Sequence, residues 1–215
     1  MVEVLKVWAD LTQLCYNRMI FINEVVMKKT SRDRLLDVTF EAVYRLGYCG
    51  AGTATILKKA GVPKGSMYHH FSSKKEMVLA MIEERLIPKV REFFDFEMRK
   101  GSRALDVLTH TMAKMSKNRM LILHGCPLHR LMFEMGSIDE EIAQACEVEF
   151  QNLSHNLARL LAFGMREGSI KEGDATAMAE FVIASTWGLL SRPLGSSSSE
   201  QFLKDTNFLL NFLQN

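Results

Sequence analysis

Residues 51–76 contain side chains of the types and spacing that recognise duplex DNA. In 64–70, KGSMYHH, hydrogen-bonding and cationic groups follow one another along a segment too short to hold a core of its own. Such groups can bond to base edges or pack on thymine methyls in the major groove. The residues expected to touch bases or phosphates are Thr53, Lys64, Gly65, Ser66, Tyr68, His69, His70 and Lys74.

Two short helices joined by a tight turn must position these groups. Apolar residues at helical spacing predict a helix over 53–60, and a second helix is expected over 64–70. Gly61 can adopt the positive φ that ends the first helix, and Pro63 suits the first turn of the second. This arrangement is typical of a helix-turn-helix.

The positive charge of the chain is concentrated around these helices. Residues 27–75 contain ten Lys and Arg against three Asp and Glu, a net charge of +7, whereas 1–26 carry −1 and 76–215 carry −4. A basic segment of this kind is expected where DNA phosphates are neutralised. A solvated basic face is the alternative interpretation, and the turn chemistry favours DNA binding.

An ordered motif runs through residues 34–84, and its spacing makes it far more specific than a lone glycine signature. Its main parts are Leu35-Leu36, Gly47-Tyr48, Ala60-Gly61-Val62, Lys64-Gly65-Ser66, His70-Phe71 and Ser73-Lys74-Lys75-Glu76. The motif resembles the DNA-binding domain of TetR/AcrR-family transcriptional regulators. Gly52 departs from the family, which usually has Thr or Ser there as a helix cap. The resemblance implies a homodimeric repressor that binds a palindromic operator and is released by a small apolar or electrophilic effector.

The whole chain predicts an all-α fold with two domains. Residues 27–76 form a helix-turn-helix DNA-binding domain, and residues 77–215 form a helical ligand-binding and dimerisation domain. Residues 1–26 form an extension that either derives from an upstream start codon or adds an accessory helix. Caps are expected at Ser31, Ser73, Ser137 and Asp174, and an interruption at Pro88. The expected helices are 31–47, 53–60, 64–70, 73–99, 102–117, 127–136, 137–168, 174–191 and 201–213.

Composition excludes several classes of protein. No run approaches the roughly 18 apolar residues of a membrane span, so no membrane partner is expected. Four scattered cysteines form neither a disulfide framework nor a C-x-x-C pair, which fits a cytoplasmic protein. No Ser-His-Asp order and no cofactor-binding loop occurs. We therefore expect neither an enzyme nor a cofactor. A module that binds only other proteins is disfavoured, because it would leave the concentration of basic residues in 27–75 unexplained.

The C-terminal part contains candidate dimer and effector residues. Phe181, Gly188, Phe208 and Phe212 lie on the last two helices, which pair with a second subunit in the resembled family. The central helices are rich in Met and aromatic residues, which together suit a pocket for an apolar or aromatic molecule. For any single Met, core packing is the better explanation. The proposed ligand-binding residues are Met112, Met115, Met132, Phe133, Phe150 and Trp187.

Cys126 lies in the cluster 124–129, HGCPLH. A Gly-Cys-Pro step followed by Glu134 is similar to a TetR-family branch in which a cysteine can be the reactive sensor, so Cys126 is a candidate sensor. Two imidazoles and a helix start could stabilise its thiolate. Two alternatives remain open: a small buried residue, and a thiol- or metal-responsive site of His124, Cys126 and His129, which lacks a fourth metal ligand.

Overall fold

The computed structural model describes residues 29–96, 101–192 and 198–214, so the proposed extension at 1–26 lies outside the described residues. The described part is helical and contains no strand. The expected all-α class is therefore confirmed. The helices are α2 (Ser31–Gly50), α3 (Thr53–Ala60), α4 (Lys64–His70), α5 (Lys74–Met81), the π-helical turn η1 (Ile82–Leu86), α6 (Ile87–Phe94), α7 (Ala104–Ser116), α8 (Arg119–His124), α9 (Pro127–Met135), α10 (Glu140–Glu167), α11 (Ala175–Leu190) and α12 (Ser199–Leu213).

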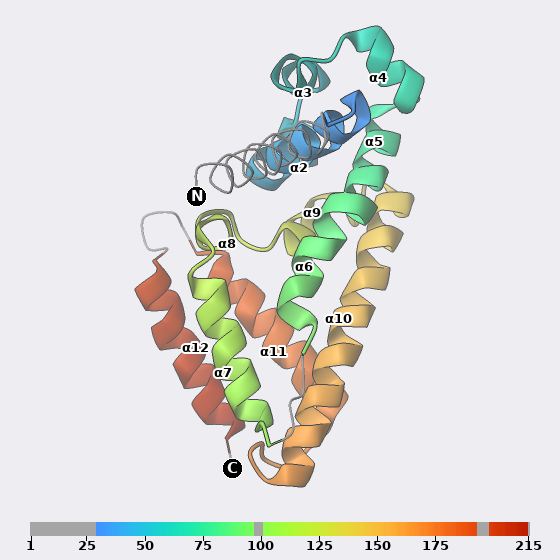
Figure 1. Ribbon diagram of the computed structural model, residues 1–215. Coiled ribbons are helices and arrows are strands. Elements are labelled where there is room, and N and C mark those ends of the chain that lie inside the picture. Colours follow the sequence, from blue (N-terminus) through green and yellow to red (C-terminus); the bar gives the residue numbers. More distant parts are fainter. Residues whose placement is uncertain (1–28, 97–100, 193–197, 215) are drawn as a thin grey trace, which may run out of the picture.

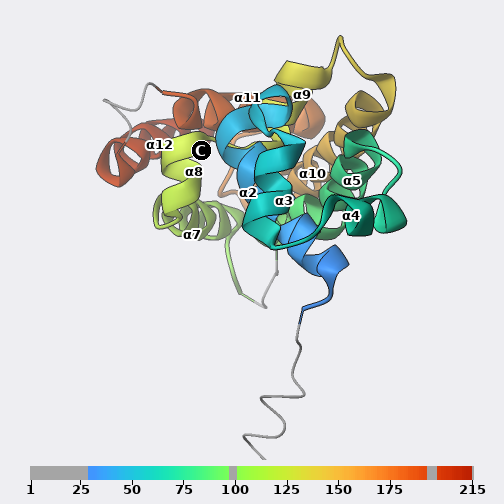
Figure 2. The same ribbon diagram turned by 90° about the horizontal axis from the view of Figure 1, so that it is seen from above.

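A small head of three helices, α2 to α4, sits on a larger helical body (Figure 1). One continuous rod made of α5, η1 and α6 runs from the head into the body, where α7, α10, α11 and α12 pack together. The short helices α8 and α9 lie between head and body. Seen from above, the head covers the middle of the body, with α12 and α4 on opposite sides (Figure 2).

Buried apolar residues hold the head together. Leu35 and Leu36 of α2, Ile56 of α3 and Met67 of α4 are at most 1% exposed, and Phe71 closes the cluster. Burying each side chain of this size contributes about 1.5–3 kcal/mol. Because α4 has only seven residues, about two turns, this packing fixes its direction.

Of the four expected helix caps, two agree with the structure and two differ. Ser73 accepts from the N–H of Glu76, and Asp174 accepts from the N–H groups of Thr176 and Ala177, as expected. The expected cap at Ser31 is wrong. Thr30 caps α2 by accepting from Asp33, because the Ser31 hydroxyl lies 2.9 Å from Nε2 of His70.

The capping box expected at Ser137 is also wrong. Asp139 caps α10 by accepting from the N–H of Ile142, and α10 begins at Glu140. The reason is that residues 136–139 close the end of α9, where Ile138 and Asp139 both donate to the carbonyl of Met135. The helix α8 was not predicted because six residues are too few to show a helical period.

The interruption expected at Pro88 takes the form of the π turn η1 just before it. Pro88 has no N–H to donate, so the helical ladder changes its spacing there instead of continuing regularly. The rod ends at Phe94, short of the expected residue 99, and residues 97–100 lie outside the described part. The next helix begins at Ala104, two residues later than expected.

Candidate nucleic-acid interface and effector cavity

The turn between α3 and α4 has the predicted chemistry. Gly61 ends α3 in the left-handed conformation with φ of 62°, and the N–H of Val62 returns to the carbonyl of Leu57. Met67 and Phe71 anchor α4 from beneath with at most 2% of each residue exposed. The opposite side of α4 is therefore presented outward as a rigid surface.

The outward side of α4 carries most of the residues predicted from sequence. Lys64, Gly65, Tyr68 and His69 are exposed, with Tyr68 52% exposed and the Lys64 ammonium 5.8 Å from the centre of its ring. Ser66 is half-buried, and Thr53 is half-buried at the start of α3. The helices α3 and α4 that carry these groups lie at the outer end of the molecule (Figure 1).

Two predicted residues of this set are engaged inside the protein. His70 lies 2.9 Å from the hydroxyl of Ser31. Lys74 donates to the carbonyl of Tyr48 at 2.5 Å and lies 4.4 Å from the centre of the Tyr48 ring. Burial lowers the pKa of Lys74, as expected for an ammonium held against the protein. His70 thus links α4 to α2, and Lys74 links α5 of the rod to α2.

Many of the other basic residues of the head also have acidic partners. Arg32 pairs with Glu84, Lys75 with Asp139 and Glu141, and Lys29 with Asp37. Ion pairs with acidic groups reduce the charge available to phosphates. Among the described residues, the exposed lysines without an acidic partner around α3 and α4 are Lys58, Lys59 and Lys64.

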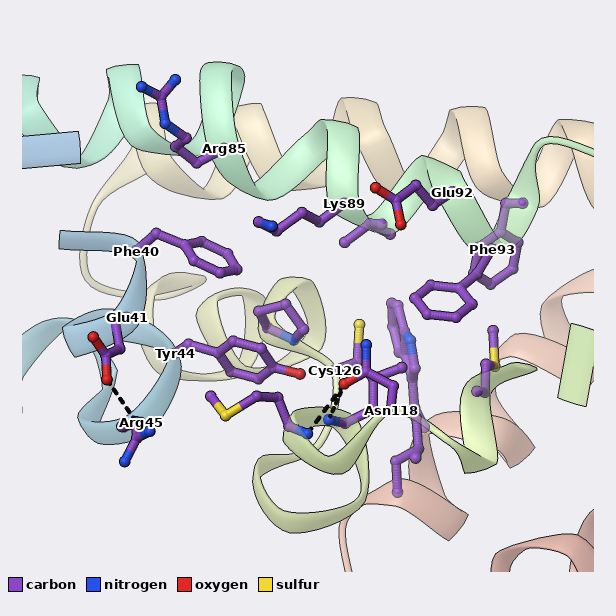
Figure 3. A pocket seen from close by; sticks show the side chains of 18 of the residues that line it. Phe40, Glu41, Tyr44, Arg45, Arg85, Lys89, Glu92, Phe93, Asn118 and Cys126 are labelled. Carbon is purple, nitrogen blue, oxygen red and sulfur yellow. Dashed lines mark hydrogen bonds and ion pairs between the residues drawn. The ribbon is translucent and has the colours of Figure 1, made fainter. Parts of the chain in front are cut away.

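A cavity of about 540 Å³ lies between the head and the body. Its wall is formed by α2, the rod, α8, the start of α9 and the end of α11 (Figure 3). Most of the wall is apolar and aromatic, which is typical of a site for a small organic molecule. Its main aromatic and thioether residues are Phe40, Tyr44, Phe93, Phe94, Met115, Met120 and Trp187.

The predicted ligand-binding residues divide into two groups. Met115 and Trp187 line this cavity, whereas Met112, Met132 and Phe150 lie outside its wall. Met112 borders a much smaller void of about 10 Å³, and the Phe150 ring packs against Trp187 at 5.5 Å. The inward placement expected for Phe133 is wrong, because its side chain is 87% exposed on α9. Helical spacing could not tell which side of this short helix faces inward.

Cys126 lines the cavity, but its surroundings do not activate a thiol. The residue is 7% exposed, and burial raises the pKa of its thiol against the opposing effect of the N–H groups of His129 and Leu128. These surroundings favour the alternative of a small buried residue over a stabilised thiolate. Around the Cys126 thiol, His129 stacks on Trp187 at 4.5 Å and His124 lies edge-on to Tyr44.

The metal-responsive alternative gains no support from this geometry. No three His, Cys, Asp or Glu side chains come together as possible ligands anywhere in the described part of the chain. His124 and His129 instead pack against different aromatic rings, those of Tyr44 and Trp187. This alternative is not favoured.

Sequence analysis did not anticipate the role of Glu134. Its carboxylate reaches from α9 across to the head and accepts from the N–H groups of Tyr48 and Cys49 at 2.7 and 2.8 Å. Gly47, with φ of 78°, makes this approach possible, because a Cβ there would collide with the carboxylate. The bond links residues 86 positions apart, so no local pattern reveals it.

The last two helices expose an aromatic face. Phe181, Phe208 and Phe212 are 50, 79 and 53% exposed, and the rings of Phe181 and Phe212 lie 5.8 Å apart. Gly188 is exposed on the same helix as Phe181, with nothing within 4 Å of where a Cβ would stand. The surface is thus apolar and open to close approach.

Comparisons with known proteins agree with this architecture. Residues 35–81 match the family model described as bacterial regulatory proteins, tetR family. The chain is 30% identical over 153 residues to the transcriptional regulator AcuR of Cereibacter sphaeroides, covering 68% of each protein. It is also 30% identical over 146 residues to the nucleoid occlusion factor SlmA of Escherichia coli, covering 65% of this chain and 70% of that protein.

A solved structure shows the same fold. The reduced form of Escherichia coli NemR superposes with a TM-score of 0.74 at 22% identity, covering 86% of this chain and 98% of the other. At this identity the match concerns the fold alone. Within the described residues, no helix has both the length and the apolar character needed to cross a membrane.

Proposed function

This chain belongs to the TetR family of bacterial transcriptional regulators, and on that premise we propose that it is a repressor released by a small effector. In this proposal two copies of the chain bind a palindromic operator, each placing α4 in a major groove. The effector occupies the cavity between head and body and weakens DNA binding.

The observation that carries the proposal is the rigid, outward surface of α4. Met67 and Phe71 fix the helix from beneath, so that Lys64, Tyr68 and His69 are exposed on its outward side. At Gly65 an added Cβ would meet nothing within 4 Å, so the protein's own packing does not require glycine there. Close approach of a DNA backbone would require it. Lys58, Lys59 and Lys64 supply the charge for phosphates.

The aromatic face of α11 and α12 supports the homodimer. Phe181, Phe208 and Phe212 leave a contiguous apolar surface open to solvent, and such surfaces mark interaction sites. A two-fold axis at this face brings the same patch of both copies together and repeats the α4 surface, as a palindromic operator demands.

The position of the cavity supports regulation by an effector. Phe40 and Tyr44 belong to α2 of the head, Phe93 to the rod, and Trp187 to the body. A molecule that contacts all three parts can favour one orientation of the head over another. Its effect on DNA binding equals its difference in affinity for the two orientations.

An electrophoretic mobility shift with the DNA upstream of the chain's own gene tests the proposal. A sequence-selective shift that weakens steeply with salt is expected, because phosphate contacts release counterions. A scrambled duplex of equal length is the control. Equal affinity for both duplexes, or no shift at low salt, would overturn the proposal.

A further inference from the structure

The Tyr44 hydroxyl is a buried polar group without a partner. Tyr44 is 6% exposed, and its oxygen has no hydrogen-bond partner among the described residues. A buried hydroxyl left in this state costs about 1–3 kcal/mol. Tyr44 lines the cavity between head and body, and Figure 3 shows its hydroxyl pointing into that cavity. The cost is removed if a bound molecule supplies the partner.

Asn118 presents a second donor to the same cavity. Its Oδ1 is used to cap α8, accepting from the N–H groups of Met120 and Leu121 at 3.1 Å each. The cap fixes the amide and leaves its Nδ2 group as a donor for which the described residues provide no acceptor. Nδ2 can only donate, and a tyrosine hydroxyl can donate as well. The matching ligand group is therefore an acceptor oxygen.

The rest of the wall defines the body of the ligand. Phe40, Phe93 and Trp187 offer ring faces and edges, and a volume of about 540 Å³ exceeds one small ring. Four of the charged groups at the rim are already neutralised: Arg85 pairs with Asp37, and Arg45 pairs with Glu41. Lys89 stands over the ring of Phe40 at 5.5 Å, without an acidic partner among the described residues.

We propose that the effector is a flat apolar molecule with an oxygen acceptor, a carbonyl or carboxylate, that accepts from Tyr44 and Asn118. This inference rests on the proposed function and specifies its ligand class. Aromatic residues hold the flat part, while the two donors select the oxygen. A site built to donate to an oxygen discriminates strongly against analogues that lack it, because its donors are then left unpaired.

Equilibrium dialysis with three naphthalene probes tests the proposal. 2-Acetylnaphthalene carries a neutral carbonyl, 2-naphthoate carries a carboxylate, and 2-isopropenylnaphthalene has nearly the shape of the ketone but no acceptor. We expect the ketone to bind about tenfold or more tightly than its isopropenyl counterpart, which is the discrimination expected of one good hydrogen bond. Equal binding of the two would overturn the proposal.

Two variants assign the discrimination to the named donors. Tyr44→Phe should reduce the preference for the ketone about tenfold, and Tyr68→Phe, the same change on the exposed side of α4, should not alter it. Asn118→Asp keeps an oxygen to cap α8 but removes the donor, and it should also weaken ketone binding. An unchanged preference in Tyr44→Phe would overturn the proposal.

Two further measurements keep the outcomes distinct. The melting temperature of ligand-free Tyr44→Phe should equal or exceed that of the unchanged chain, because a buried unpaired hydroxyl is lost. A large decrease would mean that the Tyr44 hydroxyl already has a hydrogen-bond partner, and it would overturn the proposal.

Lys89→Met distinguishes a carboxylate from a carbonyl. The variant should weaken the binding of 2-naphthoate alone if the natural group is a carboxylate, and the binding of neither probe if it is a carbonyl; both results fit an acceptor oxygen. The mobility shift without ligand reports separately on DNA binding.

Discussion

Replacing Phe208 with Glu tests the dimer face. The side chain is 79% exposed in the single chain, which for an aromatic residue of roughly 200 Å² amounts to about 160 Å² of apolar surface. At about 25 cal/mol per Å², its burial contributes about 4 kcal/mol. A two-fold interface contains the residue twice, so the substitution removes up to about 8 kcal/mol from dimer formation.

Half of that amount raises the dissociation constant of the dimer about a thousandfold, and a carboxylate buried at the interface adds to the cost. Sedimentation equilibrium at micromolar concentration should show a dimer for the unchanged chain and a monomer for Phe208→Glu. Phe133→Glu is the matched control, because Phe133 is 87% exposed on α9, and it should remain dimeric. A dimer of unchanged affinity in Phe208→Glu would refute the assignment of this face.

Three further predictions follow from the site. Tyr68→Ala should weaken operator binding by about 1–3 kcal/mol per subunit, measured by mobility shift. Its melting temperature should change by no more than about 2 °C, because the residue is 52% exposed. An unfolded variant would instead place Tyr68 in the core. Glu134→Gln removes the negative charge and one of the two oxygens that accept from the N–H groups of the head. We therefore expect the free energy of unfolding, measured with urea, to fall by about 1–2 kcal/mol. Unchanged stability would show that these hydrogen bonds add nothing. Burial lowers the pKa of His129, so the folded chain binds fewer protons than the unfolded chain, and stability falls as pH decreases below about 6.5. His129→Phe, which keeps a ring against Trp187, should lose less melting temperature between pH 7.5 and 5.5; an equal loss would contradict this.

Local sequence signals were sufficient for the head. Gly61 and Pro63 marked the turn, and Ser73 marked the start of the rod, because each acts through its own backbone or that of close neighbours. The cap predicted at Ser137 was wrong for a local reason. The residues expected to start α10 instead hydrogen-bond to the end of α9. Competition between two adjacent helix ends is not visible in a cap motif.

For the cavity, the sequence predicted the kind of site, an apolar pocket, but not most of the residues that line it. Met115 and Trp187 were identified from composition. Tyr44 and Asn118 were missed because Tyr44 belongs to the head and Asn118 caps a helix of only six residues. Glu134 was noted as a family mark, but its bond to Tyr48 depends on how head and body dock. Contacts between distant segments leave no period in the sequence.

The π turn at Ile82–Leu86 has a consequence for the geometry of DNA recognition. A wider turn accommodates one more residue than a regular α-helical turn, and each residue of an α-helix corresponds to about 100° of rotation and 1.5 Å of rise. Shortening this turn to regular spacing would therefore swivel the head about the rod axis relative to the body. In a two-fold assembly each head would rotate by the same angle about its own rod, and the two α4 helices would no longer match successive major grooves of the double helix.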